Sequence, residues 1–191
     1  MVKILVIDNG GQWTHREWRT LKYLDVQTKI IPNNIPVEDI LDEKPNGIVL
    51  SGGSPRIGLN GELGNCGELI DKSDFPIVGI CAGHQFIARH FNGKVEPSKI
   101  PEFGSVELTL IKKDSLLKKL PEKSIIWTSH NDEITEMPND FINLAESENC
   151  KFQIIKHKNK KIYGIQFHPE VEHTEYGIQI FKNFIEICEI K

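Results

Sequence analysis

The chain has 191 residues, of which 39% are hydrophobic and 26% are charged, and its net charge is -4. This acidic balance gives no electrostatic footprint for nucleic acid, and no apolar run is long enough to span a membrane. We therefore expect one soluble α/β domain over residues 1–191, with neither nucleic acid nor a membrane as a partner.

Short β-branched runs alternate with helical patterns in the first half of the chain. The patterns predict strands at residues 2–7, 26–31, 47–50 and 76–80, and helices at residues 12–24, 37–43, 62–73 and 82–91. Such alternation predicts a mostly parallel, twisted sheet with helices on both faces, in a flavodoxin-like arrangement.

The second half of the chain is richer in strand patterns joined by short turns. We expect strands at residues 105–111, 124–127, 141–145, 152–157 and 162–167, and a closing amphipathic helix at residues 174–187. Antiparallel strands added to the same sheet would explain these short connections.

The four cysteines are scattered along the chain, and no Cys-x-x-Cys pair occurs. This spacing argues against a zinc ribbon or a redox dithiol and favours a reducing, cytoplasmic compartment. Only Cys81 has a distinctive frame, since it follows an apolar strand, precedes a helix and has Gly79 and Gly83 two residues away on either side. A sharp strand-to-helix turn of this kind presents a nucleophile, although a buried cysteine between two turn glycines would show the same pattern.

A cysteine nucleophile needs a proton shuttle, which is usually a histidine. Among seven histidines, His168 ends an apolar strand, and Glu170 follows two residues later. In an extended segment these two side chains point the same way, so Glu170 could orient the His168 ring. A metal site that includes His173 is a weaker alternative, because no His-Glu-x-x-His spacing is present. We therefore expect no metal on this chain.

A glycine pair follows the strand predicted at residues 47–50. Acyl chemistry needs backbone amides aimed at an oxyanion, and glycines let the backbone approach closely. We expect the amides of Gly53 and Ala82 to serve as the two donors. A phosphate-binding loop is the competing interpretation, but neither of its glycine motifs occurs here, and an ordinary turn remains open.

Together, residues 51–53, 79–85 and 166–170 resemble the three signature segments of the class I, triad-type glutamine amidotransferases, and the resemblance covers essentially the whole chain. It implies a Cys81–His168–Glu170 triad that hydrolyses L-glutamine. It also implies that the substrate's α-amino and α-carboxylate groups are held by Gly52, Gln85, Ser129 and Asn131.

Residues 8–15, 102–104, 129–133 and 168–174 resemble the branch of this family that serves GMP synthesis. Fused members of that branch carry an ATP-pyrophosphatase domain with a Ser-Gly-Gly-Val-Asp-Ser loop, which this sequence lacks. The resemblance therefore implies no cofactor on this chain and a separate ATP-pyrophosphatase subunit that binds ATP, magnesium and XMP. The loops at residues 9–15, 129–133 and 173–174 are candidates for docking it, through His15, Asp132, Glu133, His173 and Thr174.

Three other functions stay open. An anthranilate or aminodeoxychorismate amidotransferase usually shows Asp-Asn-Tyr-Asp-Ser-Phe after the first strand, whereas this chain has Asp-Asn-Gly-Gly-Gln. A γ-glutamyl hydrolase would act without a partner. A non-catalytic regulator on the same scaffold would be expected to lack one of the three triad residues.

Overall fold

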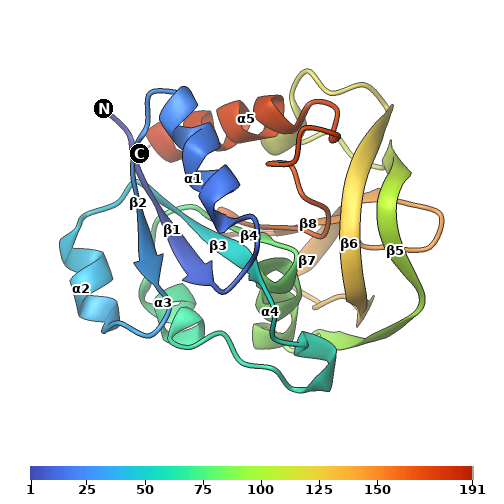
Figure 1. The fold of residues 1–191 in the computed structure, drawn as a ribbon, viewed down its shortest axis with the longest axis horizontal. Coiled ribbons are helices and arrows are strands. Elements are labelled where there is room, and N and C mark those ends of the chain that lie inside the picture. Colours follow the sequence, from blue (N-terminus) through green and yellow to red (C-terminus); the bar gives the residue numbers. More distant parts are fainter. Residues whose placement is uncertain (191) are drawn as a thin grey trace.

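The computed structural model describes residues 1–190, and its nine strands form one sheet in the order β2-β1-β3-β4-β9-β8-β7-β5-β6 (Figure 1). The strands are β1 (Lys3–Asn9), β2 (Gln27–Pro32), β3 (Gly47–Gly53), β4 (Ile77–Ile80), β5 (Lys94–Leu110), β6 (Lys123–Glu136), β7 (Phe141–Glu146), β8 (Ile154–His157) and β9 (Ile162–Ile165). The strands from β2 to β9 in this order pair in parallel, and those from β9 to β6 pair antiparallel. The predicted mixed α/β sheet is confirmed.

Helices cover both faces of the sheet, as predicted. They are α1 (Thr14–Tyr23), α2 (Val37–Asp42), α3 (Cys66–Lys72), α4 (Ala82–His90) and α5 (Gly177–Glu189). One apolar cluster joins α1 and α5 to one face, and a second joins α2, α3 and α4 to the other. Among the described helices, none is long and apolar enough to cross a membrane.

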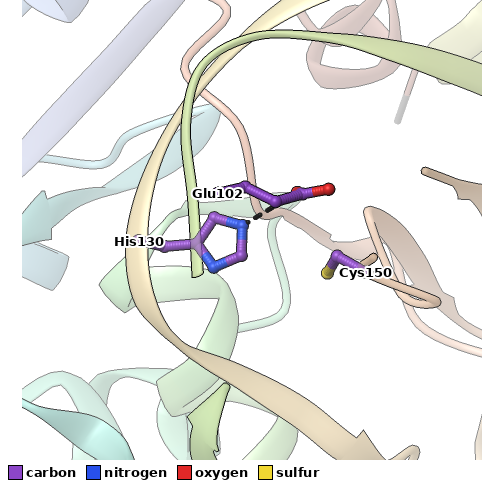
Figure 2. Close-up of side chains that lie close together, drawn as sticks. All are labelled: Glu102, His130 and Cys150. Atoms are coloured by element: carbon purple, nitrogen blue, oxygen red, sulfur yellow. Dashed lines mark hydrogen bonds and ion pairs between the residues drawn. The ribbon is translucent and has the colours of Figure 1, made fainter. Parts of the chain in front are cut away.

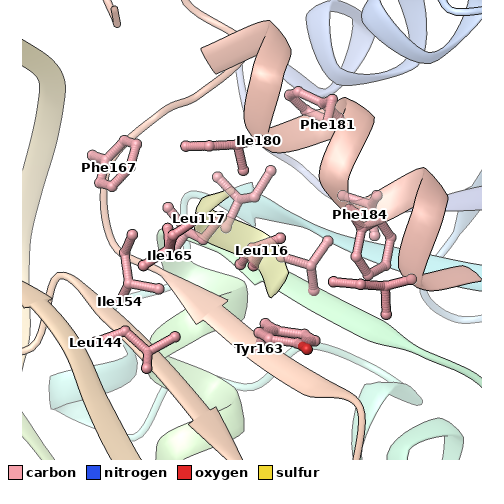
Figure 3. Close-up of a cluster of buried hydrophobic side chains, with 14 of the residues drawn as sticks. Leu116, Leu117, Leu144, Ile154, Tyr163, Ile165, Phe167, Ile180, Phe181 and Phe184 are labelled. Carbon is pink, nitrogen blue, oxygen red and sulfur yellow. The ribbon is translucent and has the colours of Figure 1, made fainter. Parts of the chain in front are cut away.

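The α5 face of the sheet buries four aromatic side chains, namely Tyr163, Phe167, Phe181 and Phe184. Phe181 and Phe184 of α5 belong to the same buried cluster as Ile165 of β9 and Ile154 of β8 (Figure 3). Burial of one such aromatic side chain stabilises the fold by about 2–3 kcal/mol. This packing holds β9, which carries the predicted histidine motif at its end, firmly in the centre of the sheet.

The last parallel strand pair decides where the chemistry can occur. Strand β4 pairs with β9 in parallel, with Ile80 opposite Ile165. The amide of Cys81 then donates to the carbonyl of Ile165 at 2.8 Å. Because both strands run the same way, the residues after each of them emerge at the same edge of the sheet.

Two strands are much longer than the sequence predicts. Strand β5 begins at Lys94 rather than at residue 105, and β6 runs to Glu136 rather than ending at residue 127. The two pair with each other, with a register shift between Pro97 and Glu102 that accommodates the prolines. Residues 129–133, predicted as a loop, therefore belong to β6.

Candidate active site

Cys81 occupies a strained turn between β4 and α4. It is the N-cap of α4 and has φ 50° and ψ -105°, a combination that L-residues rarely adopt. The flanking glycines are required by close packing. A Cβ on Gly79 would lie 2.5 Å from the backbone of Gly83, and one on Gly83 would lie 2.4 Å from the carbonyl oxygen of Leu50. The predicted nucleophile turn is thus present in the structure.

His168 and Glu170 form a buried pair directly after β9. Nδ1 of His168 lies 2.7 Å from Oε1 of Glu170. A carboxylate accepts, so Nδ1 carries the proton and Nε2 is the nitrogen left for the sulfur. Burial alone would lower the pKa of His168, but the charge of Glu170 and interactions with Cys81 and Glu170 raise that pKa to about 10. The imidazolium form is therefore favoured at neutral pH.

The ring of His168 is also held from outside the pair. Thr174 Oγ1 donates to the carbonyl of His168 at 2.7 Å and accepts from the amide of Trp127 at 2.9 Å. The indole of Trp13 meets the imidazole edge to face, with ring centroids 4.4 Å apart. These contacts limit both the backbone and the ring of His168 and so restrict the orientation of its imidazole.

A cavity of about 300 Å³ opens onto the triad. Its lining residues are Gly10, Gly11, Gln12, Trp13, Thr14, Glu17, Gly52, Gly53, Ser54, Cys81, Ser129, His168 and Glu170. The volume suits a small ligand, and the sulfur, the imidazole and the glycine loop all face it. The three residues of the predicted triad are therefore brought together around one space.

The glycine loop at the end of β3 is shaped as the oxyanion role requires. A Cβ on Gly52 would lie 3.4 Å from Cε1 of His168 and 3.6 Å from Cβ of Cys81, so this position borders the reacting groups. A Cβ on Gly53 would lie 2.4 Å from the carbonyl oxygen of Asn9. Ala82 is the first residue of α4, so its amide has no acceptor within the helix. The oxyanion role of Gly53 and Ala82 stays a prediction.

The four predicted glutamine contacts divide into two pairs. Gly52 and Ser129 line the cavity, and the carbonyl of Ser129 lies 3.8 Å from the Cys81 sulfur. Gln85 and Asn131 do not line it. The Gln85 amide instead donates to the carbonyl of Asp132 at 2.7 Å, which leaves its predicted contact with the substrate a prediction.

The structure corrects two of the predicted partner contacts. Asp132 is buried and pairs with Arg56, and Thr174 is buried and bonded as described above. Glu133 lines a different cavity, away from Cys81. His15 and His173 are exposed, and His173 lies against the ring of Trp127 with centroids 4.9 Å apart, so these two remain predicted contacts.

Sequence reasoning missed Glu17, a buried carboxyl in the first turn of α1. It is 1% exposed and lines the cavity beside Glu170 and His168. Burial and the charge of Glu170 raise the pKa of Glu17 well above its ordinary value. Glu17 lies three residues after Thr14 and four before Leu21, a spacing that puts all three on the core-facing side of the helix. A glutamate at such a position was the signal in the sequence that could have revealed it.

A second Cys–His–Glu group joins β5, β6 and the connection between β7 and β8. Glu102, His130 and Cys150 have ligand-type atoms within 4.8 Å of one another and are buried (Figure 2). Both oxygens of Glu102 already accept hydrogen bonds, from Ser147 at 2.7 Å and from Gln153 at 2.8 Å, besides contacting His130 at 3.1 Å. As it stands, this group is a polar network that supports β5 and β6.

The remaining cysteines have the surroundings of core residues. Burial raises the pKa of the Cys66 and Cys188 thiols to about 12, and it also raises the pKa of Cys150. All four cysteines are free. Cys81 differs in bordering the cavity and in facing an imidazole, as a nucleophile must.

The family model of the class-I glutamine amidotransferases matches residues 5–188. The chain belongs to this amidotransferase family. It is 49% identical over 190 residues to a protein from Thermoplasma volcanium that is named as one of the subunits of a glutamine-hydrolysing GMP synthase, covering 99% of this chain and 93% of the relative. A relative of the same name from Thermococcus kodakarensis is 48% identical, covering 97% and 98% of the two chains.

Solved structures agree with this amidotransferase assignment. A crystal structure of a protein from Thermoplasma acidophilum, provisionally named as the same GMP synthase subunit, superposes with a TM-score of 0.93 at 49% identity, covering 99% of this chain and 94% of the other. A glutamine amidotransferase from Thermotoga maritima gives a TM-score of 0.72 at 20% identity, covering 98% and 82%, and shows the shared fold alone.

Proposed function

We propose that this chain is the glutaminase subunit of a two-subunit GMP synthase, hydrolysing L-glutamine and passing ammonia to a synthetase subunit. The observation that carries the proposal is the buried His168–Glu170 pair facing Cys81 across one cavity. The names of the two close relatives support the choice of GMP synthesis.

The first half-reaction forms a thioester. The Cys81 thiolate attacks the side-chain amide carbon of glutamine, while the amides of Gly53 and Ala82 hold the tetrahedral oxyanion. The carbon–nitrogen bond then breaks as Nε2 of His168 gives its proton to the departing amine, and ammonia leaves. The imidazolium favoured by Glu170 is therefore the form that this step needs.

The second half-reaction restores the thiolate of Cys81 and the imidazolium of His168. Water attacks the glutamyl thioester as Nε2 of His168 takes one of its protons, and the carbon–sulfur bond breaks to release glutamate. Glu170 keeps the ring in place through both steps, because its hydrogen bond to Nδ1 persists whether Nε2 is charged or neutral.

Ammonia must reach the partner without being protonated by water. The exposed His15 and His173 both adjoin segments that contact His168, at residues 10–14 and 174. We place the docking face there, over the cavity. The partner would bind ATP, magnesium and XMP, and the complex would work in the cytoplasm, as the four free cysteines favour.

Mixing the chain with a candidate synthetase subunit, ATP, magnesium and XMP tests the proposal. Cys81→Ala should abolish GMP formation from glutamine and leave GMP formation from added ammonium intact. Glutamine hydrolysis should also be faster with the partner than without it. Equal rates would remove the coupling between subunits, and hydrolysis of γ-glutamyl peptides by the chain alone would favour a stand-alone hydrolase.

A further inference from the structure

We propose that Glu17 is a positioning residue of the glutaminase site, a protonated carboxyl that ties the oxyanion loop to the triad carboxylate. The inference rests on the proposed glutamine hydrolysis and adds a residue to its machinery. Glu17 lies on α1, an element that contributes none of the three triad residues.

The burial of Glu17 is unusual for a side chain with this charge. It is 1% exposed, and its Oε2 is one of the buried oxygens that have no hydrogen-bond partner among the described residues. Leaving such an acceptor unsatisfied costs about 1–3 kcal/mol, and a buried charge would cost more. A proton on Glu17 removes the charge and turns one oxygen into a donor.

Glu170 supplies the matching acceptor. Its Oε1 binds His168, whereas its Oε2 is buried and also lacks a partner within residues 1–190. Glu170 is the neighbouring charge with the largest effect on Glu17, ahead of His168 and Asp8. Two carboxyl groups facing one cavity share a single negative charge most easily when one of them keeps its proton. The pairing with His168 assigns that charge to Glu170.

The other oxygen of Glu17 reaches the glycine loop. The backbone amide of Gly52 donates to the Glu17 carboxyl. One turn earlier in α1, Thr14 Oγ1 lies 3.2 Å from Ser51 Oγ, which donates to the Gly52 carbonyl at 2.8 Å. The first turn of α1 thus holds the peptide groups on both sides of Gly52, next to the proposed donor Gly53.

Glu17 therefore acts on the reaction through two groups that touch the substrate. It orients the Gly52–Gly53 backbone. It also donates a hydrogen bond to Oε2 of Glu170, and Glu170 in turn orients His168. Because the oxyanion is absent from bound glutamine and develops only as the tetrahedral intermediate forms, loss of this support should lower kcat and leave KM nearly unchanged.

Three substitutions in the full chain, assayed with the synthetase subunit present, test the proposal. Glu17→Gln keeps an acceptor for Gly52 and a donor toward Glu170, so kcat for glutamine hydrolysis should fall by less than about threefold. Glu17→Met keeps the shape without either group, and kcat should fall by roughly tenfold with KM within about twofold. Because Met leaves the Gly52 amide and Oε2 of Glu170 without a partner, the melting temperature should fall by a few degrees.

Glu17→Asp is the third substitution, and it tests the proposal even if Glu17→Met fails to fold. It keeps the acid but is one methylene shorter, so it loses the Gly52 amide and should lose kcat as Glu17→Met does. The matched control is Glu186→Met, at an exposed helical glutamate paired with Lys118, which should keep wild-type kcat.

Equal kcat for Glu17→Met and wild type would overturn the role of Glu17, and so would equal losses in Glu17→Gln and Glu17→Met. Full activity of Glu17→Asp would overturn it as well. These results differ from failure of the proposed function, in which the wild-type chain itself would release no ammonia from glutamine, with or without the partner.

Discussion

Replacing Glu170 with glutamine removes one charge from the buried triad and keeps the shape of the side chain. The pKa of His168 is about 10, against 6.5 for an ordinary histidine. That difference favours the charged ring by at most roughly 5 kcal/mol, since one pH unit corresponds to about 1.4 kcal/mol. The charge of Glu170 is the largest of the causes that raise this pKa.

The variant should therefore lose the imidazolium at lower pH. In the wild type, the ring stays charged until the pH rises through about 10, so the proton for the leaving amine is available over the neutral range. In Glu170→Gln the alkaline limb of kcat/KM for glutamine should move down by about one to three pH units. The side-chain carbonyl of the new glutamine can still accept from Nδ1, so the effect isolates charge from geometry.

The free energy of unfolding should also depend on the proton of His168. A histidine whose pKa is raised on folding stabilises the native state fully below its unfolded pKa, and this contribution is lost as pH rises through the folded pKa. The difference in unfolding free energy between wild type and Glu170→Gln should thus be greatest near pH 6 and shrink toward pH 10. Urea unfolding across this range measures it.

Two results would refute this reasoning. One is an alkaline limb at the same pH in both proteins. The other is a stability difference that does not change between pH 6 and pH 10, because a purely steric loss would be independent of the His168 proton.

Two further predictions concern the shape of the site. Gly52→Ala should fold normally, because the nearest contact of its Cβ, with His168 Cε1, would be 3.4 Å, but the methyl group would lie among the reacting groups and lower kcat/KM by about 100-fold. The matched control is Gly67→Ala, whose nearest contacts are also 3.4 Å or more. Equal activity of the two variants would contradict the placement of Gly52. Thr174→Val loses the hydrogen bonds to His168 and Trp127, so its free energy of unfolding, measured by heat or urea, should fall by about 1–3 kcal/mol, and kcat should fall as well. An unchanged kcat would show that Thr174 does not orient His168.

The triad was predictable from the sequence because its signals are local. Glycines two residues from Cys81 indicate the sharp turn, and a histidine at a strand end with a glutamate two residues later indicates the pair. A general rule of α/β sheets places such ends at one edge, but the parallel pairing of β4 with β9, which brings Cys81 to His168, was not predicted, because the strand at residues 162–167 was expected among the antiparallel additions.

The residues that were expected at the surface but are buried owe their burial to partners far away in the chain. Asp132 was expected to dock the partner as part of a loop at residues 129–133, but it is buried, and Arg56, which lies 76 residues earlier, donates to it at 2.9 Å. The polar segment around Asp132 belongs to β6 and pairs with the part of β5 that contains Pro97. Local propensity argues against a strand there, and tertiary pairing prevails.

The central position of β9 has a consequence for synthesis of the protein. Strand β4 is made early, yet its neighbour in the sheet is made last among the nine strands. Until residues 162–165 have emerged from the ribosome, the β4 edge lacks its final partner and Cys81 has no imidazole beside it. A nascent chain therefore carries an inert thiol for most of its translation, and it gains the ability to split glutamine only when the sheet closes.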